Sequence, residues 1–242
     1  MTAPVFLVDR SLLDADRVTL SGPEGRHATT VRRIAPGERV DLTDGAGLRA
    51  RCVVVAARSG ELDLAVAERH EEPAPACRLA VAQAILKGDR AELAVELMTE
   101  VGVDEIVPWA AERCIARWRP DRDHLGRWRA TAREAAKQAR RAWFPEVSSS
   151  VRLPELADRV RGAELAVLLD PDAERRLSEL APPATGSILL LVGPEGGVSD
   201  AEAQELTRSG AVAARLGPSV LRGSTAGAVA AALTLSRCGR WD

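Results

Sequence analysis

Residues 187–197 of the sequence read Ser-Ile-Leu-Leu-Leu-Val-Gly-Pro-Glu-Gly-Gly. The apolar run from Ile188 to Val192 stands between turn formers, which predicts a strand that is buried on both faces. The glycines and Pro194 that follow indicate a sharp turn with few side chains. Ser199 and Glu202 have the spacing of a capping box, so a helix should begin there. Such a strand, turn and helix N-terminus direct backbone N–H groups to the carboxyl edge of a sheet, where open α/β sheets bind ligands.

A second glycine-rich loop lies downstream, where residues 216–227 read Leu-Gly-Pro-Ser-Val-Leu-Arg-Gly-Ser-Thr-Ala-Gly. It also falls between a short apolar strand and a helix, and two such loops predict one shared pocket. The first loop matches neither the P-loop nor the dinucleotide fingerprint, which argues against nucleoside triphosphates and NAD. Pro194 lacks an N–H, and Glu195 would repel a phosphate. A cationic or zwitterionic ligand with an adenosine part fits better; alternatively, the glycines serve only close helix–sheet packing.

The composition is that of an ordinary globular protein. The chain has 242 residues, of which 46% are apolar and 28% charged. No apolar run is long enough to cross a bilayer, and the N-terminus lacks the basic region of a signal peptide, so we expect a cytoplasmic protein. No nucleophile elbow, metalloprotease motif or paired-carboxylate signature indicates a hydrolase. The scattered cysteines and histidines predict no metal site; the cysteines are Cys52, Cys77, Cys114 and Cys238.

The pattern along the chain predicts two domains. Residues 1–70 show short strands and a compact barrel is expected, with strands over 5–8, 39–42, 48–55 and 61–67 and one helix over 22–34. The proline-punctuated stretch 71–75 is the linker candidate. Strands and helices then alternate, which predicts a mostly parallel α/β sheet. Its strands are expected over 79–86, 106–109, 165–169, 188–192 and 212–216, and its helices over 89–101, 125–143, 200–209 and from 225. On the first of these helices Leu93, Leu97 and Val101 should form the apolar stripe.

Positive charge is concentrated in one part of the chain. Residues 1–70 are neutral, whereas residues 113–141 carry ten basic and three acidic side chains. On the helix predicted over 125–143, Trp128, Ala132, Ala135 and Ala139 form an apolar stripe, and Arg129, Arg133, Lys137, Arg140 and Arg141 follow another face. That face is either solvated or tracks a phosphate backbone. For the basic cluster on the helix over 22–34, a solvated surface is the favoured interpretation.

Several motifs in this sequence resemble those of a known family. Both glycine-rich loops, Leu191 to Ser199 with Glu202 and Leu216 to Ala226, are similar to the two C-terminal signatures of the bacterial 16S rRNA (uracil(1498)-N(3))-methyltransferases, the RsmE family. Three further motifs resemble its N-terminal, central and basic-helix motifs: His27 with Val31 to Arg33 and Gly37; Lys87 to Arg90 with Thr99 to Gly102; and Arg127 to Arg129 with Glu134 to Arg141 and Pro145 to Val147. The resemblance spans nearly the whole chain.

The resemblance implies an N-terminal PUA-like β-barrel over residues 1–72 and a C-terminal SPOUT α/β domain with a trefoil knot over residues 77–242. It also implies a homodimer that binds S-adenosyl-L-methionine and acts on 16S rRNA in the small ribosomal subunit. The cofactor-binding residues carried over are Leu191, Gly193, Glu195, Gly196, Gly197, Leu216, Gly217, Leu221, Arg222 and Thr225. The RNA-binding residues carried over are Arg10, Arg26, His27, Arg32, Arg33, Lys87, Arg90, Arg133, Lys137, Arg140 and Arg141.

The catalytic residues expected on this resemblance are Arg222, Ser224 and Thr225, with Arg222 holding the uracil carbonyl and stabilising negative charge. Two positions depart from the family pattern. Gly223-Ser224 stands where the family commonly has Thr-Glu, so a glutamate is missing from the obvious place for a general base, and Leu97 replaces a usual lysine. Alternatives are another SPOUT methyltransferase that acts on tRNA, and a non-catalytic RNA-binding or ribosome-assembly factor. A nicotinamide-dependent oxidoreductase lacks its fingerprint here.

Overall fold

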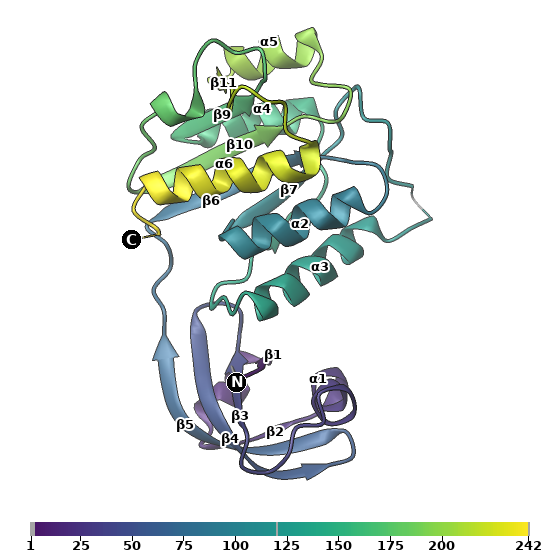
Figure 1. Ribbon diagram of the computed structural model, residues 1–242, viewed down its shortest axis with the longest axis vertical. Helices are drawn as coiled ribbons and strands as arrows, with labels where there is room; N and C mark the ends of the chain where they lie inside the picture. Colours follow the sequence, from purple (N-terminus) through teal and green to yellow (C-terminus); the bar gives the residue numbers. More distant parts are fainter. Residues whose placement is uncertain (1–2, 120, 242) are drawn as a thin grey trace. The chain divides into compact units, whose positions relative to one another are not determined.

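The computed structural model of the protein describes residues 3–119 and 121–241 (Figure 1). The chain forms two compact units. The first runs up to Ala74 and also includes Ala136–Phe144, and the second comprises Pro75–Ala135 and the chain from Pro145 onward. Within the described ranges, no helix is both long enough and apolar enough to cross a membrane.

The first unit contains a curled sheet of five strands in the order β1-β3-β4-β5-β2 (Figure 1). Its strands are β1 (Val5–Leu7), β2 (Arg17–Leu20), β3 (Arg39–Thr43), β4 (Leu48–Arg58) and β5 (Glu61–Glu71). All four predicted strands are present, and β2 is an addition. Both β1 and β2 are edge strands, and no ladder joins them to each other among the described residues. The predicted closed barrel is therefore an open, curled sheet.

Alternation along the strands decides which face of this sheet is buried. In β4 every second side chain from Leu48 to Val54 is buried, because successive side chains of a strand point to opposite faces. The predicted helix over 22–34 is divided into α1 (Gly22–Arg26) and a π-helical turn, η2 (His27–Val31). A Cβ on Gly25 would lie 2.6 Å from the Leu20 carbonyl oxygen, so this helix packs directly on the backbone of the sheet.

The second unit is built on a parallel sheet of six strands in the order β11-β9-β10-β6-β7-β8. They are β6 (Cys77–Ala84), β7 (Glu105–Trp109), β8 (Glu146–Val147), β9 (Leu165–Leu169), β10 (Gly186–Val192) and β11 (Val212–Ala214). Every pairing is parallel, as the alternation of strands and helices predicts. Because β10 lies inside the sheet between β9 and β6, its residues from Ile188 to Val192 are buried.

Helices cover both faces of this sheet. On one face, α2 (Arg90–Val101), α3 (His124–Gln138) and α6 (Gly223–Arg237) contribute to one hydrophobic cluster. On the other, α4 (Leu153–Gly162) and α5 (Asp200–Arg208) pack into a second cluster. The sequence pattern does not reveal α4, whose ten residues carry four charged side chains and a proline.

The predicted apolar stripe of α2 is wrong at Leu93, whereas Leu97 and Val101 are half-buried and pack against the main hydrophobic cluster. Leu93 is 42% exposed, and the residues that α2 buries include Ala91, Ala94, Val95 and Met98. The face of α2 that packs on α6 carries small side chains because the two helices lie close together: a Cβ on Gly227 would come within 3.0 Å of the Met98 sulfur. Leucines at helical spacing therefore identified the helix and not its buried face.

The helix predicted over 125–143 ends earlier, at Gln138. Arg140 has a left-handed backbone (φ 55°), which stops the helix. The segment Ala136–Phe144 belongs to the first unit, where the Gly47 N–H donates to the Ala142 carbonyl (3.1 Å) and the Phe144 N–H donates to the Gly45 carbonyl (2.8 Å). Arg140 and Arg141 are thus not part of a helical basic stripe.

Candidate functional site

A cleft of about 650 Å³ lies at the carboxyl edge of the parallel sheet. Both glycine-rich loops line it, together with the loops that follow β6 and β9. The lining includes Leu86, Arg90, Arg113, Leu168 to Asp172, Val192 to Glu195, Gly197, Val198, Leu216, Gly217 and Ser219 to Ser224. The two loops therefore share one pocket, as their sequence pattern predicts.

A buried tryptophan fixes the point where β10 leaves the sheet. The indole N–H of Trp109, at the end of β7, donates to the carbonyl of Val192 over 2.9 Å, and both residues are buried. A buried indole needs such a partner. The first glycine-rich loop starts directly after this bond, so its first residue is held both by β10 and by a side chain from β7, which lies beyond β6 in the sheet.

Packing and backbone conformation explain the glycines of the first loop. A Cβ on Gly193 would lie 2.8 Å from a methyl group of Val198, and one on Gly196 would lie 3.0 Å from the carbonyl oxygen of Arg113. Gly197 has a φ of +74°, which strongly favours glycine. In this loop the packing interpretation of the glycines is therefore sufficient.

Gly217, in the second loop, has no such explanation. Its φ lies outside the left-handed region, and no heavy atom lies within 4 Å of where its Cβ would be. Because Gly217 lines the cleft, an added side chain would take up space inside it. Apart from Pro218, which has no N–H, the backbone N–H groups from Leu216 to Arg222 find no acceptor among the described residues. Residues 216–222 thus offer a ligand both room and hydrogen-bond donors.

Glu202 connects the end of the first glycine-rich loop to the segment that follows β7. The predicted capping box is confirmed: one carboxylate oxygen accepts from the Ser199 N–H (3.1 Å). The other accepts from the Glu112 N–H (2.8 Å), and Glu202 is only 4% exposed. Next to Glu112, the Arg113 guanidinium donates to the Val198 carbonyl (3.4 Å). The segment after β7 is therefore attached to the glycine-rich loop.

The predicted site residues fall into two groups. Those that line the cleft are Gly193, Glu195, Gly197, Leu216, Gly217, Leu221, Arg222 and Ser224. Leu191, Gly196 and Thr225 lie outside its lining: Leu191 is fully buried in β10, and the Thr225 N–H donates to the Arg222 carbonyl in the first turn of α6 (2.8 Å). Ser224 is 4% exposed, whereas Arg222 is exposed.

Sequence reasoning missed several lining residues, above all Arg113 and Asp170 to Asp172. A signal existed for the second group, because the strand over 165–169 was predicted and parallel strands end at one edge. No local pattern marks Arg113, which reaches the pocket only through the contacts of Glu202 and Gly196.

The cysteines do not form a reactive cluster. Burial raises the pKa of the Cys52 thiol to about 11, and burial with the neighbouring Cys238 raises the pKa of the Cys77 thiol to about 11. Both are therefore protonated at neutral pH. Among the residues that the structure describes, no group of three or more His, Cys, Asp and Glu side chains could hold a metal ion.

Comparison with known proteins identifies the family. The model of an RNA methyltransferase domain matches residues 72–235, and that of an RNA methyltransferase PUA domain matches residues 20–66. The chain is 47% identical to the ribosomal RNA small subunit methyltransferase E of Mycobacterium tuberculosis, over 100% of this chain and 95% of that protein. The chain belongs to the ribosomal RNA small subunit methyltransferase E family.

Two more distant members of this methyltransferase E family agree with that assignment. The protein from Synechocystis is 31% identical over 89% of this chain and 71% of its own length. A crystal structure of the Neisseria gonorrhoeae enzyme bound to S-adenosyl methionine superposes with a TM-score of 0.87, at 26% identity, over 97% of this chain and 98% of that one. The resemblance inferred from the motifs is confirmed.

Because members of the methyltransferase E family are named as acting on ribosomal RNA, the positions of the predicted RNA-binding residues matter. In the first unit Arg26, Arg32 and Arg33 are exposed, and Arg33 has a left-handed backbone (φ 52°). His27 is half-buried, with its ring against Phe6. Arg10 pairs with Asp44 (2.9 Å) and Glu71 (2.7 Å).

The predicted basic stripe on α3 is not maintained in the structure. Arg133 is exposed, but the Lys137 side chain is only 9% exposed and its ammonium group binds the Glu24 carboxylate (3.0 Å). The Arg140 guanidinium donates to the Ala3 carbonyl, and Arg141 is half-buried. Lys87 and Arg90 are exposed beside the pocket, which Arg90 lines.

Proposed function

We propose that this protein transfers a methyl group from S-adenosyl-L-methionine to N3 of uridine 1498 in the 16S rRNA of the small ribosomal subunit. The observation that carries the proposal is the pocket that two glycine-rich loops share, in a chain that matches the methyltransferase E family over its whole length. Gly217 is its most informative residue, because neither backbone conformation nor packing requires a glycine there.

The residues of the pocket fit this cofactor. Residues 216–222 carry unused N–H groups for a carboxylate, ribose or adenine, and Leu86 and Leu216 offer apolar surface. Glu195 lines the same pocket, and its carboxylate is compatible with a cation. When bound, S-adenosylmethionine supplies an electrophilic methyl group on a positively charged sulfur.

Arg222 is the residue best placed to act on the uracil. Its side chain is exposed at the pocket, at the N-terminus of α6, where the helix dipole also favours negative charge. Methylation breaks the N3–H bond of uracil and would break the bond between the cofactor's sulfur and its methyl group, and an N3–CH₃ bond forms. Removal of the N3 proton leaves the base anionic. Arg222 holds a uracil carbonyl and stabilises that charge by a positioned hydrogen bond. Ser224 and Thr225 supply further hydrogen bonds, and solvent or an RNA phosphate accepts the proton.

The rest of the assignment follows the family resemblance. Residues 1–72 form the PUA-like RNA-binding domain, and residues 77–242, apart from the segment Ala136–Phe144 that belongs to the first unit, form the SPOUT domain, whose last segments form a trefoil knot. The protein acts as a homodimer in the cytoplasm. The exposed cations Arg26, Arg32, Arg33, Lys87, Arg90 and Arg133 contact rRNA. Arg10, Lys137 and Arg140 already have partners within the first unit.

The test is methyl transfer with a defined product. Purified protein, labelled S-adenosylmethionine and small ribosomal subunits from a strain without this gene are incubated, and the rRNA is digested and analysed by mass spectrometry. We expect 3-methyluridine near the 3′ end of 16S rRNA. Methylation at another nucleotide would refute the assigned target, and absence of any transfer with cofactor bound would refute 16S rRNA as the substrate.

A further inference from the structure

The segment between β7 and α3 has an unusual pattern of exposure. From residue 113 to 119 the side chains alternate strictly: Arg113, Ile115, Arg117 and Arg119 are exposed, and the three between them are half-buried. The segment forms neither helix nor strand. Alternation of this kind is typical of extended backbone, in which successive side chains point to opposite sides. We name residues 113–119 and 121–122 the arginine arm.

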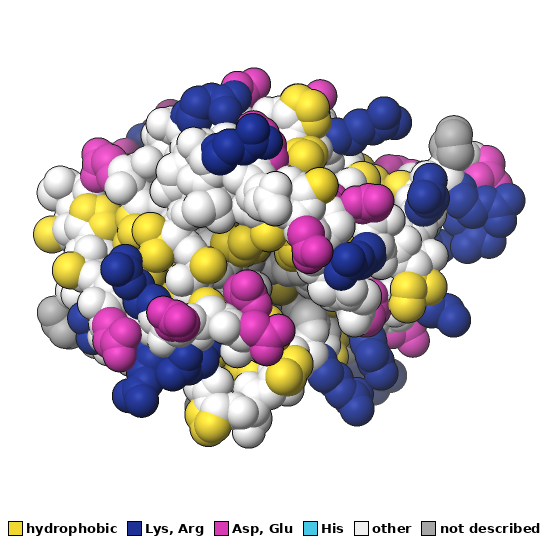
Figure 2. Space-filling model, turned by 90° about the horizontal axis from the view of Figure 1, so that it is seen from above, with side chains coloured by type: hydrophobic (Ala, Val, Ile, Leu, Met, Phe, Trp, Pro, Cys, Tyr) yellow, Lys and Arg dark blue, Asp and Glu magenta, His cyan; other side chains and the backbone are white. Residues whose placement is uncertain are grey.

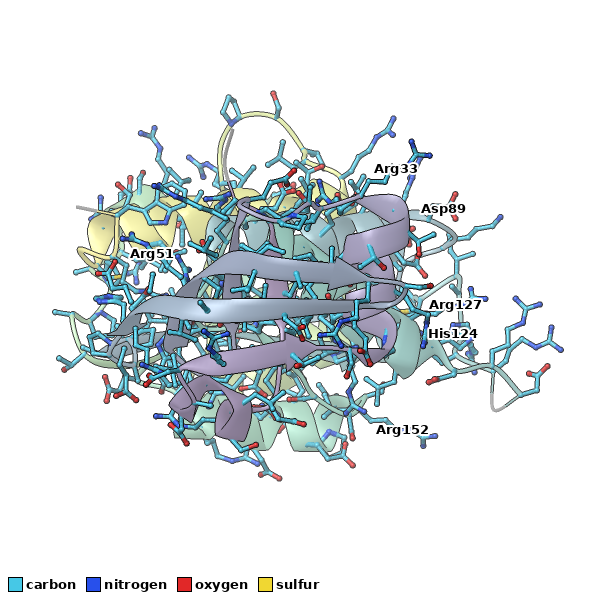
Figure 3. All side chains as sticks on the ribbon, turned by 90° about the horizontal axis from the view of Figure 1, so that it is seen from below. Arg33, Arg51, Asp89, His124, Arg127 and Arg152 are labelled. Carbon is cyan, nitrogen blue, oxygen red and sulfur yellow. The ribbon has the colours of Figure 1, made fainter. Side chains whose placement is uncertain are left out.

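Contacts hold both ends of the arginine arm. At the pocket, Glu202 binds the N–H of Glu112, and Arg113 packs against Gly196. Further along, the Trp118 ring stacks on His124, with centroids 5.7 Å apart, and meets the edge of Trp128 at 5.4 Å. Trp118 also packs against the main hydrophobic cluster of the second unit. In Figure 3, His124 and Arg127 lie at the start of α3, and neighbouring side chains extend away from the ribbon.

The exposed side of the arm is strongly basic. It carries four arginines and one acid, Asp121. Arg119 pairs with Asp121 over 3.3 Å, but both side chains are more than 60% exposed, so this pair contributes little to stability. Arg117 and Arg122 have no acidic partner among the residues that the structure describes. Figure 2 shows lysine and arginine side chains at several places on this face, among them a group at its right-hand end.

The first residue of the arm is part of the pocket itself. Arg113 lines the cleft together with Arg222, and the other arginines follow it along one chain segment that leads away from the cleft. An RNA strand whose target base enters the pocket must continue out of it on both sides. A group of exposed guanidinium groups suits the phosphates of such a strand, since guanidinium binds phosphate in a forked geometry. Ile115, 66% exposed between arginines, offers apolar contact to a base or sugar.

We propose that the arginine arm is a second RNA-binding element, which holds the phosphate backbone of the rRNA strand next to the methylated nucleotide. This inference rests on the proposed function. It adds Arg113, Arg117, Arg119 and Arg122 to the contact surface and places them beside the pocket rather than in the PUA domain. Because Trp118 anchors the arm, its backbone has less conformational entropy to lose when RNA binds.

The test compares three variants by RNA binding. The first combines Arg117→Ala, Arg119→Ala and Arg122→Ala; the second has lysine at the same positions; the third removes equal charge from α4 and α5 by Arg152→Ala, Arg161→Ala and Arg208→Ala. Affinity for a naked 16S rRNA transcript is measured as a function of salt. Each lost contact to single-stranded RNA lowers the slope of log K against log salt by about 0.7, which is about fourfold in affinity at 0.15 M salt. Three lost contacts predict about a 50-fold loss.

The expected pattern is a weakened, less salt-sensitive alanine variant, a lysine variant with the salt slope of wild type but an affinity between the two, and an unaffected α4–α5 control. Cofactor affinity and melting temperature should stay unchanged in all three. An unchanged salt slope in the alanine variant would overturn the proposal, as would an equal loss in the control. Weaker binding to whole subunits alone, with naked RNA unaffected, would indicate a ribosomal protein as partner and also overturn it. If wild type binds RNA through the arm but transfers no methyl group, the arm stands and the proposed function fails.

Discussion

Gly217 allows a direct test of the pocket, because the protein alone gives no reason for a glycine at this position. In Gly217→Ala the added methyl group meets no heavy atom within 4 Å, and the backbone needs no left-handed conformation. Alanine also restricts the unfolded chain, so the free energy of unfolding should stay the same or rise by up to about 1 kcal/mol. If a ligand lies against residues 216–222, the same methyl group overlaps it. Overpacking of this kind costs about 1–3 kcal/mol, or about 5- to 150-fold in the dissociation constant.

The assay is isothermal titration with S-adenosylmethionine, alongside thermal unfolding of the free protein. Gly162→Ala is the matched control: it also has open space around its Cβ, but it lies at the end of α4 and does not line the cleft. We expect both variants to fold as stably as wild type and only Gly217→Ala to lose affinity. A dissociation constant within twofold of wild type for Gly217→Ala would refute the inference that this loop holds the cofactor.

Three further changes test other parts of the structure. Arg222→Ala should lower the methyl-transfer rate about 100-fold or more with cofactor affinity retained; a single-turnover rate within a few-fold of wild type would exclude its role. Burial alone would raise the pKa of the Glu105 carboxyl, but hydrogen bonds from Ser148 and Arg159 outweigh burial and lower that pKa. The stabilising effect of the ionised Glu105 carboxylate is therefore present above about pH 4.3 and is lost as pH falls through the folded pKa. Glu105→Gln should therefore reduce the free energy of unfolding by about 1–2 kcal/mol at pH 7 and by less at pH 3, and equal losses in urea titrations at both pH values would contradict this. Trp109→Phe leaves the Val192 carbonyl buried without its partner and should cost about 1–3 kcal/mol, a fall in melting temperature of several degrees; an unchanged melting temperature would show that the bond is dispensable.

The sequence predicts the parts of the fold that local chemistry decides. The apolar run from Ile188 to Val192 could only be buried on both faces, and β10 is indeed inside the sheet. The capping box of Ser199 marks the start of α5 because its bonds are local. Leu93 is an example of what the sequence does not predict. Which side of α2 faces the core depends on the close approach of α6, and the spacing of the leucines carries no information about that contact.

In the candidate site, too, the sequence predicts the features that depend on local residues and not those that depend on tertiary contacts. The two loops were found because strand, glycines and helix start are each visible in a short stretch of sequence. Arg113 was not found, because a buried carboxylate on α5, Glu202, fixes its position from far along the chain. Lys137 was assigned to an exposed face for a related reason: its partner, Glu24, is remote in sequence. Tertiary contacts, rather than local propensity, decided these positions.

The segment from Ala136 to Phe144 has a consequence for how this protein can be divided. It belongs to the first unit, although it lies far beyond the linker, and there the Trp143 indole donates to the Glu72 carbonyl (3.0 Å) and its ring leaves room only for a glycine at position 47. A gene fragment that stops at the linker encodes a first unit without this segment. Recombination that exchanged one domain for another at the linker would leave both products incomplete, so the two are expected to be inherited together.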